Sequence, residues 1–131
     1  MKKPASIPFD FVLERLGSCA PLVRPMFGCH AIYLGERIVM MLRNKENHED
    51  DNGVWLAIAP EHHQSLKKIF PAMRPVRLLG ERTSVWYNIP VACDDFEESV
   101  ITACEMIIKN DPRIGKIPKR KGKKTRGVTR R

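Results

Sequence analysis

The apolar residues near the start of the chain recur with the spacing of one helical face. Four of them stand at positions i, i+3, i+4 and i+7: Phe9, Val12, Leu13 and Leu16. In a helix this spacing places all four on one side. Ser6 is suited to cap such a helix, and Gly17 is suited to end it. The pattern therefore predicts a helix over residues 7–16.

Short apolar runs replace this spacing further along the chain. Residues 31–34 and 37–42 are largely apolar, and Gly35-Glu36 between them has the composition of a turn. Two such runs joined by a short link predict a β-hairpin. Residues 44–53 are charged and polar, which is typical of an exposed loop. Residues 54–58 form a third apolar run, and the three runs together predict an antiparallel meander.

Prolines delimit the elements that follow. Pro60 suits the first turn of a second helix, because its missing N–H would have no partner there, and Pro71 ends that helix. Residues 76–79 and 85–89 are two further apolar runs rich in Val, Leu and aromatic residues. They predict two more strands.

A third helix is predicted over residues 94–109. Asp94 and Asp95 each precede a glutamate by three positions, so a capping box is available at its start. The order of one helix, three strands, a helix, two strands and a helix predicts the α+β class, with an antiparallel sheet backed by helices. We expect one domain over residues 1–111 and a disordered tail over residues 112–131, where apolar periodicity stops.

Charge separates these two parts of the chain. The chain has 23 basic and 15 acidic residues and a net charge of +8. Ten of the basic residues and no acidic residue lie in residues 112–131, so residues 1–111 hold 13 basic and 15 acidic residues. Such a run is an electrostatic footprint for a polyanion. The residues expected to bind nucleic acid are Arg113, Lys116, Lys119, Arg120, Lys121, Lys123, Lys124, Arg126, Arg130 and Arg131.

Length and composition limit the class of protein. A chain of 131 residues and 15.0 kDa buries a core without needing disulfides or metals. Its apolar runs are far shorter than the roughly 20 residues of a membrane span, and no apolar segment of a signal peptide follows the first residues. We therefore expect a cytoplasmic protein without membrane insertion. Its cysteines are expected to be reduced thiols: Cys19, Cys29, Cys93 and Cys104.

Two stretches resemble a known family. Arg24-Pro25-Met26-Phe27-Gly28, followed by the hairpin of residues 31–42, resembles the Arg-x-Met-Phe-Gly-Gly entry of the TfoX N-terminal domain family, with Cys29 in place of the second glycine. Val85-Trp86-Tyr87-Asn88-Ile89-Pro90 resembles that family's second signature, a Tyr-containing strand that ends in an apolar-Pro pair. The resemblance spans roughly residues 9–109. It assigns structural roles to the motif residues Arg24, Met26, Phe27, Gly28, Trp86, Tyr87 and Pro90.

The resemblance carries expectations about fold and function. The family fold is an α-β3-α-β2-α sandwich, in agreement with the order of elements predicted from the pattern. The family implies a small, non-enzymatic bacterial protein linked to transcriptional regulation or to DNA uptake in competence. It brings no defined set of catalytic residues. Competence regulators of this family also carry a C-terminal helical domain, where this chain has the basic tail.

Three groups of residues invite a catalytic or metal-binding interpretation. Cys29 and His30 are neighbours on a predicted strand and point to opposite faces, so we expect a buried thiol and a surface or edge imidazole. His62 and His63 lack the i, i+4 spacing of zinc ligands and are expected on a solvated helix face. Residues 48–52 lack the alternation of a calcium loop and are expected to be solvated. We predict no cofactor, no metal and no small-molecule substrate.

Aromatic residues on the strands offer a second route to nucleic acid. Trp55, Trp86 and Tyr87 would stack on bases if they were exposed. On a half-buried sheet, however, aromatic residues more often serve packing. Met26 and Phe27 are expected in the core, with Gly28 allowing a bend or bulge.

Three hypotheses of function follow. The first is a non-enzymatic accessory or regulatory protein whose basic tail binds nucleic acid without reading its sequence. The second is a protein-interaction module, possibly homodimeric, in which the sheet or the helix over residues 94–109 docks a partner and the tail only aids solubility. The third is an enzyme centred on Cys29, which requires an accessible thiol with a lowered pKa.

Overall fold

A computed structural model describes residues 7–78 and 85–117 of the chain. Its helices and strands, in chain order, are α1 (Phe11–Arg15), β1 (Leu22–Met26), β2 (Cys29–Leu34), β3 (Arg37–Arg43), β4 (Gly53–Ala57), α2 (His63–Ile69), β5 (Arg74–Pro75), β6 (Trp86–Pro90) and α3 (Phe96–Ile108). Short 3-10 turns lie at Gly17–Cys19, Glu49–Asp51 and Pro60–His62. The class is α+β, as the sequence predicts.

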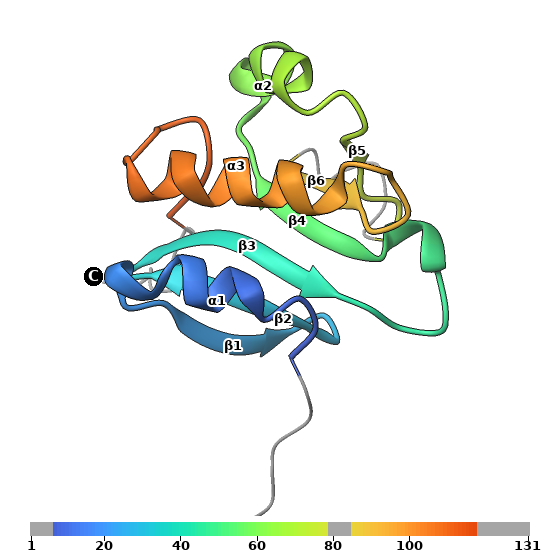
Figure 1. Cartoon of the computed structure of the whole chain (residues 1–131), viewed down its shortest axis with the longest axis horizontal. Coiled ribbons are helices and arrows are strands. Elements are labelled where there is room, and N and C mark those ends of the chain that lie inside the picture. The colour runs from blue at the N-terminus through green and yellow to red at the C-terminus, as the bar shows by residue number, and fades with distance from the viewer. Residues whose placement is uncertain (1–6, 79–84, 118–131) are drawn as a thin grey trace, which may run out of the picture.

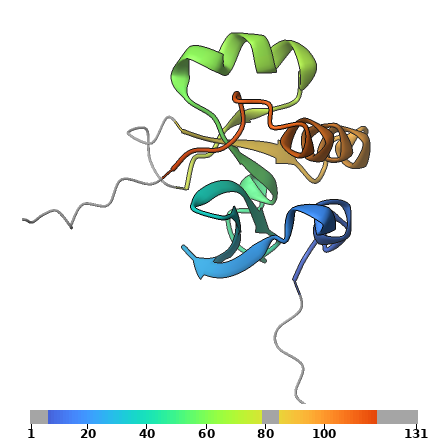
Figure 2. The same cartoon turned by 90° about the vertical axis from the view of Figure 1, so that its left-hand side faces the viewer.

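The strands form one antiparallel sheet in the order β1-β2-β3-β4-β6-β5. Helices α1 and α3 lie against the same face of this sheet and contact each other (Figure 1). The view turned by a quarter circle shows both helices on one side of the strands, with α2 above them (Figure 2). Strand β4 is buried along its whole length, because side chains cover both faces of the sheet there.

Two apolar clusters fill the space on either side of the sheet. The larger cluster joins the sheet to the helices and includes Leu56 of β4 and Val100 of α3. The smaller cluster lies on the opposite face and includes Trp55 and Trp86. Because side chains alternate between faces along a strand, neighbouring residues of β4 contribute to different clusters.

The sheet differs from the prediction in two strands. Four strands, not three, precede α2, because Leu22–Met26 forms β1. Pro25 argues against a central strand, but β1 is an edge strand, where a proline is tolerated. The second predicted pair of strands is also shifted: residues 76–79 were expected to form a strand, but the named strand is Arg74–Pro75. Val76 still donates its N–H to the carbonyl oxygen of Trp86 at 3.1 Å.

The helices are confirmed with shorter bounds. The helix expected over residues 7–16 is reduced to Phe11–Arg15, because Phe9 has a φ of 56° that a right-handed helix does not allow. The Phe9 ring instead packs edge-on against Phe96, with ring centroids 5.0 Å apart. The capping box expected at the start of α3 is not formed, since Asp95 makes no side-chain capping hydrogen bond.

The folded chain continues beyond the boundary expected at residue 111. Asn110, with a φ of 62°, ends α3 in a Schellman motif. Its N–H donates to the carbonyl of Ile107, and the N–H of Asp111 donates to the carbonyl of Met106. Ile114 is then fully buried in the larger cluster. Lys116 exchanges two backbone hydrogen bonds with Ile38 of β3, at 2.9 and 3.0 Å. Residues 112–117 therefore belong to the domain; residues 118–131 lie outside the described residues.

Candidate nucleic-acid interface

The hairpin of β1 and β2 is closed by only two residues, Phe27 and Gly28. Met26 pairs with Cys29 across the turn, and both central residues have positive φ, 55° and 75°. This is the geometry of a type I′ turn, in which Asn-Gly or Gly-Gly is preferred. The bend expected at Gly28 is confirmed. The expectation that Phe27 lies in the core is wrong, because its side chain projects from the tip and is 58% exposed.

Placing a phenylalanine in this turn has an energetic cost. A bulky residue in the left-handed region is strained by about 1–3 kcal/mol. An interior aromatic would recover that amount through burial, but Phe27 is exposed and recovers little. The strain at the tip is therefore not explained by the packing of the fold.

Lys45 lies beside the same turn. A Cβ atom added to Gly28 would stand 2.9 Å from Nζ of Lys45, so the glycine leaves the space that the ammonium group occupies. The backbone of Lys45 is held by Asn52, whose side-chain oxygen accepts the Lys45 N–H at 2.9 Å and whose amide nitrogen donates to the Lys45 carbonyl at 2.8 Å. A cation thus lies beside the turn that carries the exposed Phe27.

The position of Asn52 depends on a buried arginine. Arg43 is only 2% exposed. One of its guanidinium nitrogens donates to the carbonyl of His48 at 2.9 Å and to Oδ1 of Asn52 at 2.7 Å, and the other donates to Oδ1 of Asn47 at 2.9 Å. Hydrogen bonds from a charged donor are the stronger kind. Arg43 therefore organises the loop that follows it.

The acidic part of this loop is hydrogen-bonded to the residues that follow β5, at the other end of the sheet. The carboxylate of Asp51 accepts the backbone N–H groups of Arg77 and Leu78, at 3.2 and 2.8 Å. The backbone carbonyl of Asp51 accepts the indole N–H of Trp55 at 2.8 Å. The expectation of a solvated loop over residues 48–52 is therefore wrong for Asp51 and Asn52, which are buried. The sequence signal for this network was weak, because Arg43 follows an apolar strand as many surface residues do.

Cys29 has the environment of a buried thiol. It is 2% exposed, and its sulfur donates to the carbonyl of Phe27 at 3.6 Å. Burial raises the pKa of the Cys29 thiol, although the nearby positive charges of Arg43 and Lys45 act in the opposite direction. His30 is half-buried and lies between Pro25 of β1 and Leu42 of β3, so it is on an inner strand and not at the surface or the sheet edge as expected. A raised pKa opposes the thiolate that a nucleophilic cysteine needs.

His62, which ends the 3-10 turn before α2, and His63, the first residue of α2, are less exposed than predicted. His63 Nδ1 and the Tyr87 hydroxyl are 2.8 Å apart, and the two rings are in contact with centroids separated by 4.2 Å. Burial raises the pKa of Tyr87. His63 therefore anchors α2 to β6 rather than lying on a solvated face. Among the described residues, no group of three His, Cys, Asp or Glu side chains is placed to hold a metal ion.

The aromatic residues of the strands serve packing. Trp55 and Trp86 are buried, with ring centroids 6.2 Å apart. Tyr87 is half-buried against α2, and Pro90 is buried opposite Gly53. At the sheet edge, the Arg24 guanidinium lies over the Tyr33 ring, 5.5 Å from its centroid. Packing is therefore confirmed for the two tryptophans.

Two of the ten predicted nucleic-acid-binding residues are described. The guanidinium of Arg113 bonds the Asp111 carboxylate at 2.8 and 3.0 Å and donates to Oγ of Ser65 at 2.8 Å. The hydrogen bond from Arg113 lowers the pKa of Asp111 to about 2. Lys116 is exposed, with its backbone paired to Ile38. The other eight lie outside the described residues: Lys119, Arg120, Lys121, Lys123, Lys124, Arg126, Arg130 and Arg131.

The charge of the chain divides at the end of the described domain. Residues 118–131 contain eight basic and no acidic residues, so residues 1–117 contain 15 basic and 15 acidic residues. The net charge of +8 therefore belongs entirely to residues 118–131. We call residues 118–131 the basic segment.

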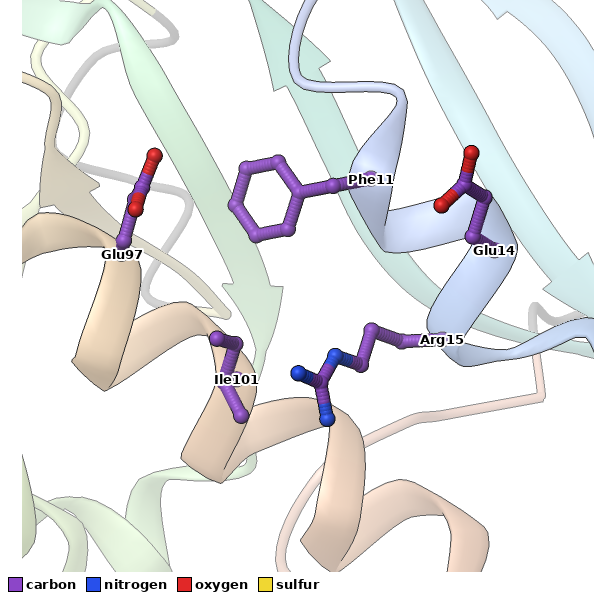
Figure 3. Close-up of a pocket in the computed structure, with 5 residues that line it drawn as sticks. All are labelled: Phe11, Glu14, Arg15, Glu97 and Ile101. Carbon is purple, nitrogen blue, oxygen red and sulfur yellow. The ribbon is translucent and has the colours of Figure 1, made fainter.

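A pocket of about 480 Å³ lies between α1 and α3 (Figure 3). Its lining residues are Phe11, Glu14, Arg15, Glu97 and Ile101. Figure 3 shows Phe11 and Arg15 reaching from α1 toward α3, with the carboxylates of Glu14 and Glu97 at the sides. Because its charged groups are two acids and one base, the pocket is poorly suited to a phosphate backbone.

Comparisons with known proteins give no relative. No protein-family model, no curated protein and no solved structure matches this chain. The resemblance to the TfoX N-terminal domain family therefore stays a prediction. Within the described residues, no helix has both the length and the apolar composition needed to cross a lipid bilayer.

Proposed function

We propose that this protein is a non-enzymatic accessory or regulatory protein, with a TfoX N-terminal-like domain, that binds nucleic acid through its basic segment. The observation that carries the proposal is the division of charge. A domain with equal numbers of acids and bases is followed by a segment with eight bases and no acid. The expected setting is bacterial transcription or DNA uptake in the cytoplasm.

The physical basis is the release of counterions. Each phosphate that a Lys or Arg neutralises frees condensed cations, so the affinity falls steeply with added salt. The basic segment contains no aromatic residue, which removes base stacking as a source of affinity within it. Contacts to phosphates carry no sequence information directly. The segment is therefore proposed to bind without sequence preference.

The contribution of the ten predicted residues is unequal in this proposal. The Arg113 guanidinium is already bonded to Asp111 and Ser65, so binding a phosphate would require breaking these contacts. Lys116 is exposed where the described chain ends. The eight residues of the basic segment are thus proposed to supply most of the binding.

Paired charge substitutions test this proposal. Lys123→Gln with Lys124→Gln removes two charges from the basic segment, and Lys68→Gln with Lys109→Gln removes two exposed charges from the domain. Fluorescence anisotropy with labelled DNA at several salt concentrations measures the effect. The first variant is expected to reduce the slope of log K against log salt by about 1.4 to 1.8. Equal slopes for both variants would contradict the proposal.

The edge strand β1 favours a second candidate function, a protein-interaction module. Within the described residues β1 pairs only with β2, and Leu22 on it is 48% exposed. An uncovered edge strand is a template for pairing with another chain. Analytical ultracentrifugation tests the homodimeric form of this candidate. A monomer at all concentrations would remove it.

A further inference from the structure

Phe27 is unusual among the aromatic residues of this protein. The chain has five Phe, two Trp and two Tyr residues, all within the described ranges. Eight of the nine are buried or half-buried, and Phe27 alone is mainly exposed. It is also held in a left-handed backbone conformation at the tip of a hairpin. An exposed aromatic on a strained backbone has no role in packing, and strain of this kind concentrates at functional positions.

Positive charge lies beside the turn and along the hairpin that carries this ring. Nζ of Lys45 lies beside Gly28, the residue after Phe27. Arg24, three residues before Phe27, is exposed and lies over the Tyr33 ring. The whole hairpin, residues 22–34, contains no Asp or Glu. The hairpin therefore presents an exposed apolar ring at its tip, with Lys45 beside the turn, Arg24 further along the strand and no acid of its own.

Hydrogen bonds to buried side chains fix the backbone of Lys45. Asn52 holds both backbone polar groups of Lys45, and the buried Arg43 donates to the same Asn52 oxygen. The ammonium group is therefore presented by a fixed backbone rather than by a free loop. Such a support is typical of a binding residue, because fixing it in advance lowers the entropy lost on binding.

We infer that the hairpin tip is a contact for single-stranded nucleic acid, in which a base stacks on Phe27 and the adjoining phosphates lie near Lys45 and Arg24. Aromatic stacking with a positive surface is the usual means of binding single strands without reading sequence. A duplex offers its phosphates but not the faces of its bases, which are already stacked. The inference rests on the proposed function, because the basic segment supplies the long-range attraction and the tip supplies the preference for single strands.

Substitutions of Phe27 in the full chain test the inference. Phe27→Ala removes the stacking surface, and Phe27→Asn does so with a residue that the turn prefers, so Phe27→Asn is expected to keep the fold. Phe27→Trp keeps a stacking surface. Leu22→Ala is the matched control, because Leu22 is an exposed apolar residue of the same hairpin away from the tip. The probes are a short oligothymidylate and a duplex of mixed sequence, at one fixed salt concentration.

The expected result is a selective loss. Phe27→Ala and Phe27→Asn should bind the oligothymidylate roughly 5- to 100-fold more weakly and bind the duplex as the wild type does. Phe27→Trp should retain the affinity, and the emission of the new tryptophan should be quenched on binding. Leu22→Ala should be unchanged. Wild-type affinity of Phe27→Asn for both probes would overturn the inference and leave the proposed function standing. A wild-type protein that binds neither probe would overturn both.

Discussion

Asn52 forms hydrogen bonds with the backbone of Lys45 through both polar atoms of its side-chain amide. The Asn52 oxygen accepts the Lys45 N–H at 2.9 Å, and the Asn52 nitrogen donates to the Lys45 carbonyl at 2.8 Å. The same oxygen accepts a hydrogen bond from the buried Arg43 at 2.7 Å. One amide thus links a buried charge to a residue beside the hairpin tip, and the order of the polar loop depends on it.

Replacing Asn52 by alanine should destabilise the domain. The change leaves a guanidinium nitrogen of Arg43 without one of its acceptors and frees the backbone of Lys45, at an expected cost of about 1–3 kcal/mol in the free energy of unfolding. Urea denaturation measures this cost. The control is Asn47→Ala, which removes another Arg43 acceptor at an exposed site where water replaces it. Equal effects of the two changes would contradict the central position of Asn52.

Gly53→Ala is predicted to be among the most damaging single substitutions. A Cβ atom at Gly53 would stand 2.1 Å from the carbonyl oxygen of Ile89, and the φ of 147° is one that L side chains rarely adopt. Strands β4 and β6 would have to separate at this point, so the expected loss exceeds about 4 kcal/mol. Gly17→Ala, where an added Cβ meets nothing within 4 Å, should change the stability by less than about 1 kcal/mol. Thermal denaturation of both variants distinguishes them, and a Gly53→Ala protein of normal stability would contradict the close approach of Gly53 to the Ile89 carbonyl.

The extension of the domain to residue 117 is tested at Ile114. Ile114→Ala removes a fully buried side chain and should cost about 2–5 kcal/mol. Ile117→Ala changes a side chain that is 61% exposed and should have an effect within about 0.5 kcal/mol. Guanidinium denaturation measures both. If the two variants unfolded at the same concentration, residues 112–117 would not be part of the core.

The ion pair of Asp111 and Arg113 makes a pH-dependent contribution. The folded-state pKa of Asp111, about 2, lies below its ordinary value of 3.8. The stabilisation is therefore complete above about pH 4 and is lost as the pH falls through 2. Because both side chains are partly exposed, its size should be about 1 kcal/mol or less. Asp111→Asn should lower the unfolding temperature at pH 7 but not at pH 2, and an equal difference at both pH values would contradict this account.

Local patterns predicted most helices and strands but not where each begins and ends. Helix α3 and strands β2, β3 and β4 were found because their apolar residues repeat within a few positions. Strand β1 was not predicted because it contains Pro25. A proline is compatible with a strand at the edge of a sheet, and only the tertiary structure shows that β1 lies there. The start of α1 was misplaced because only the contact with Phe96, distant in sequence, explains the left-handed backbone of Phe9.

The candidate site was less predictable than the fold. Gly28 indicated a bend, but an apolar residue beside it is normally assigned to the core, so the exposure of Phe27 could not be foreseen. The buried position of Arg43 depends on acceptors supplied by a loop that reads as solvated. Ile114 is a single apolar residue after the last helix, and its partners in the sheet are far away in the sequence. Each of these features is set by tertiary contacts.

The most direct test of nucleic-acid binding through the basic segment compares the full chain with a chain that ends after residue 117. The shorter chain keeps Ile114 and the pairing of Lys116 with Ile38, and it lacks only the basic segment. Anisotropy titrations against duplex DNA over a range of salt concentrations should show steep salt dependence for the full chain, with a slope no steeper than about −7 for eight cations, and far weaker binding for the shorter chain. Equal affinity of the two chains would contradict the central claim.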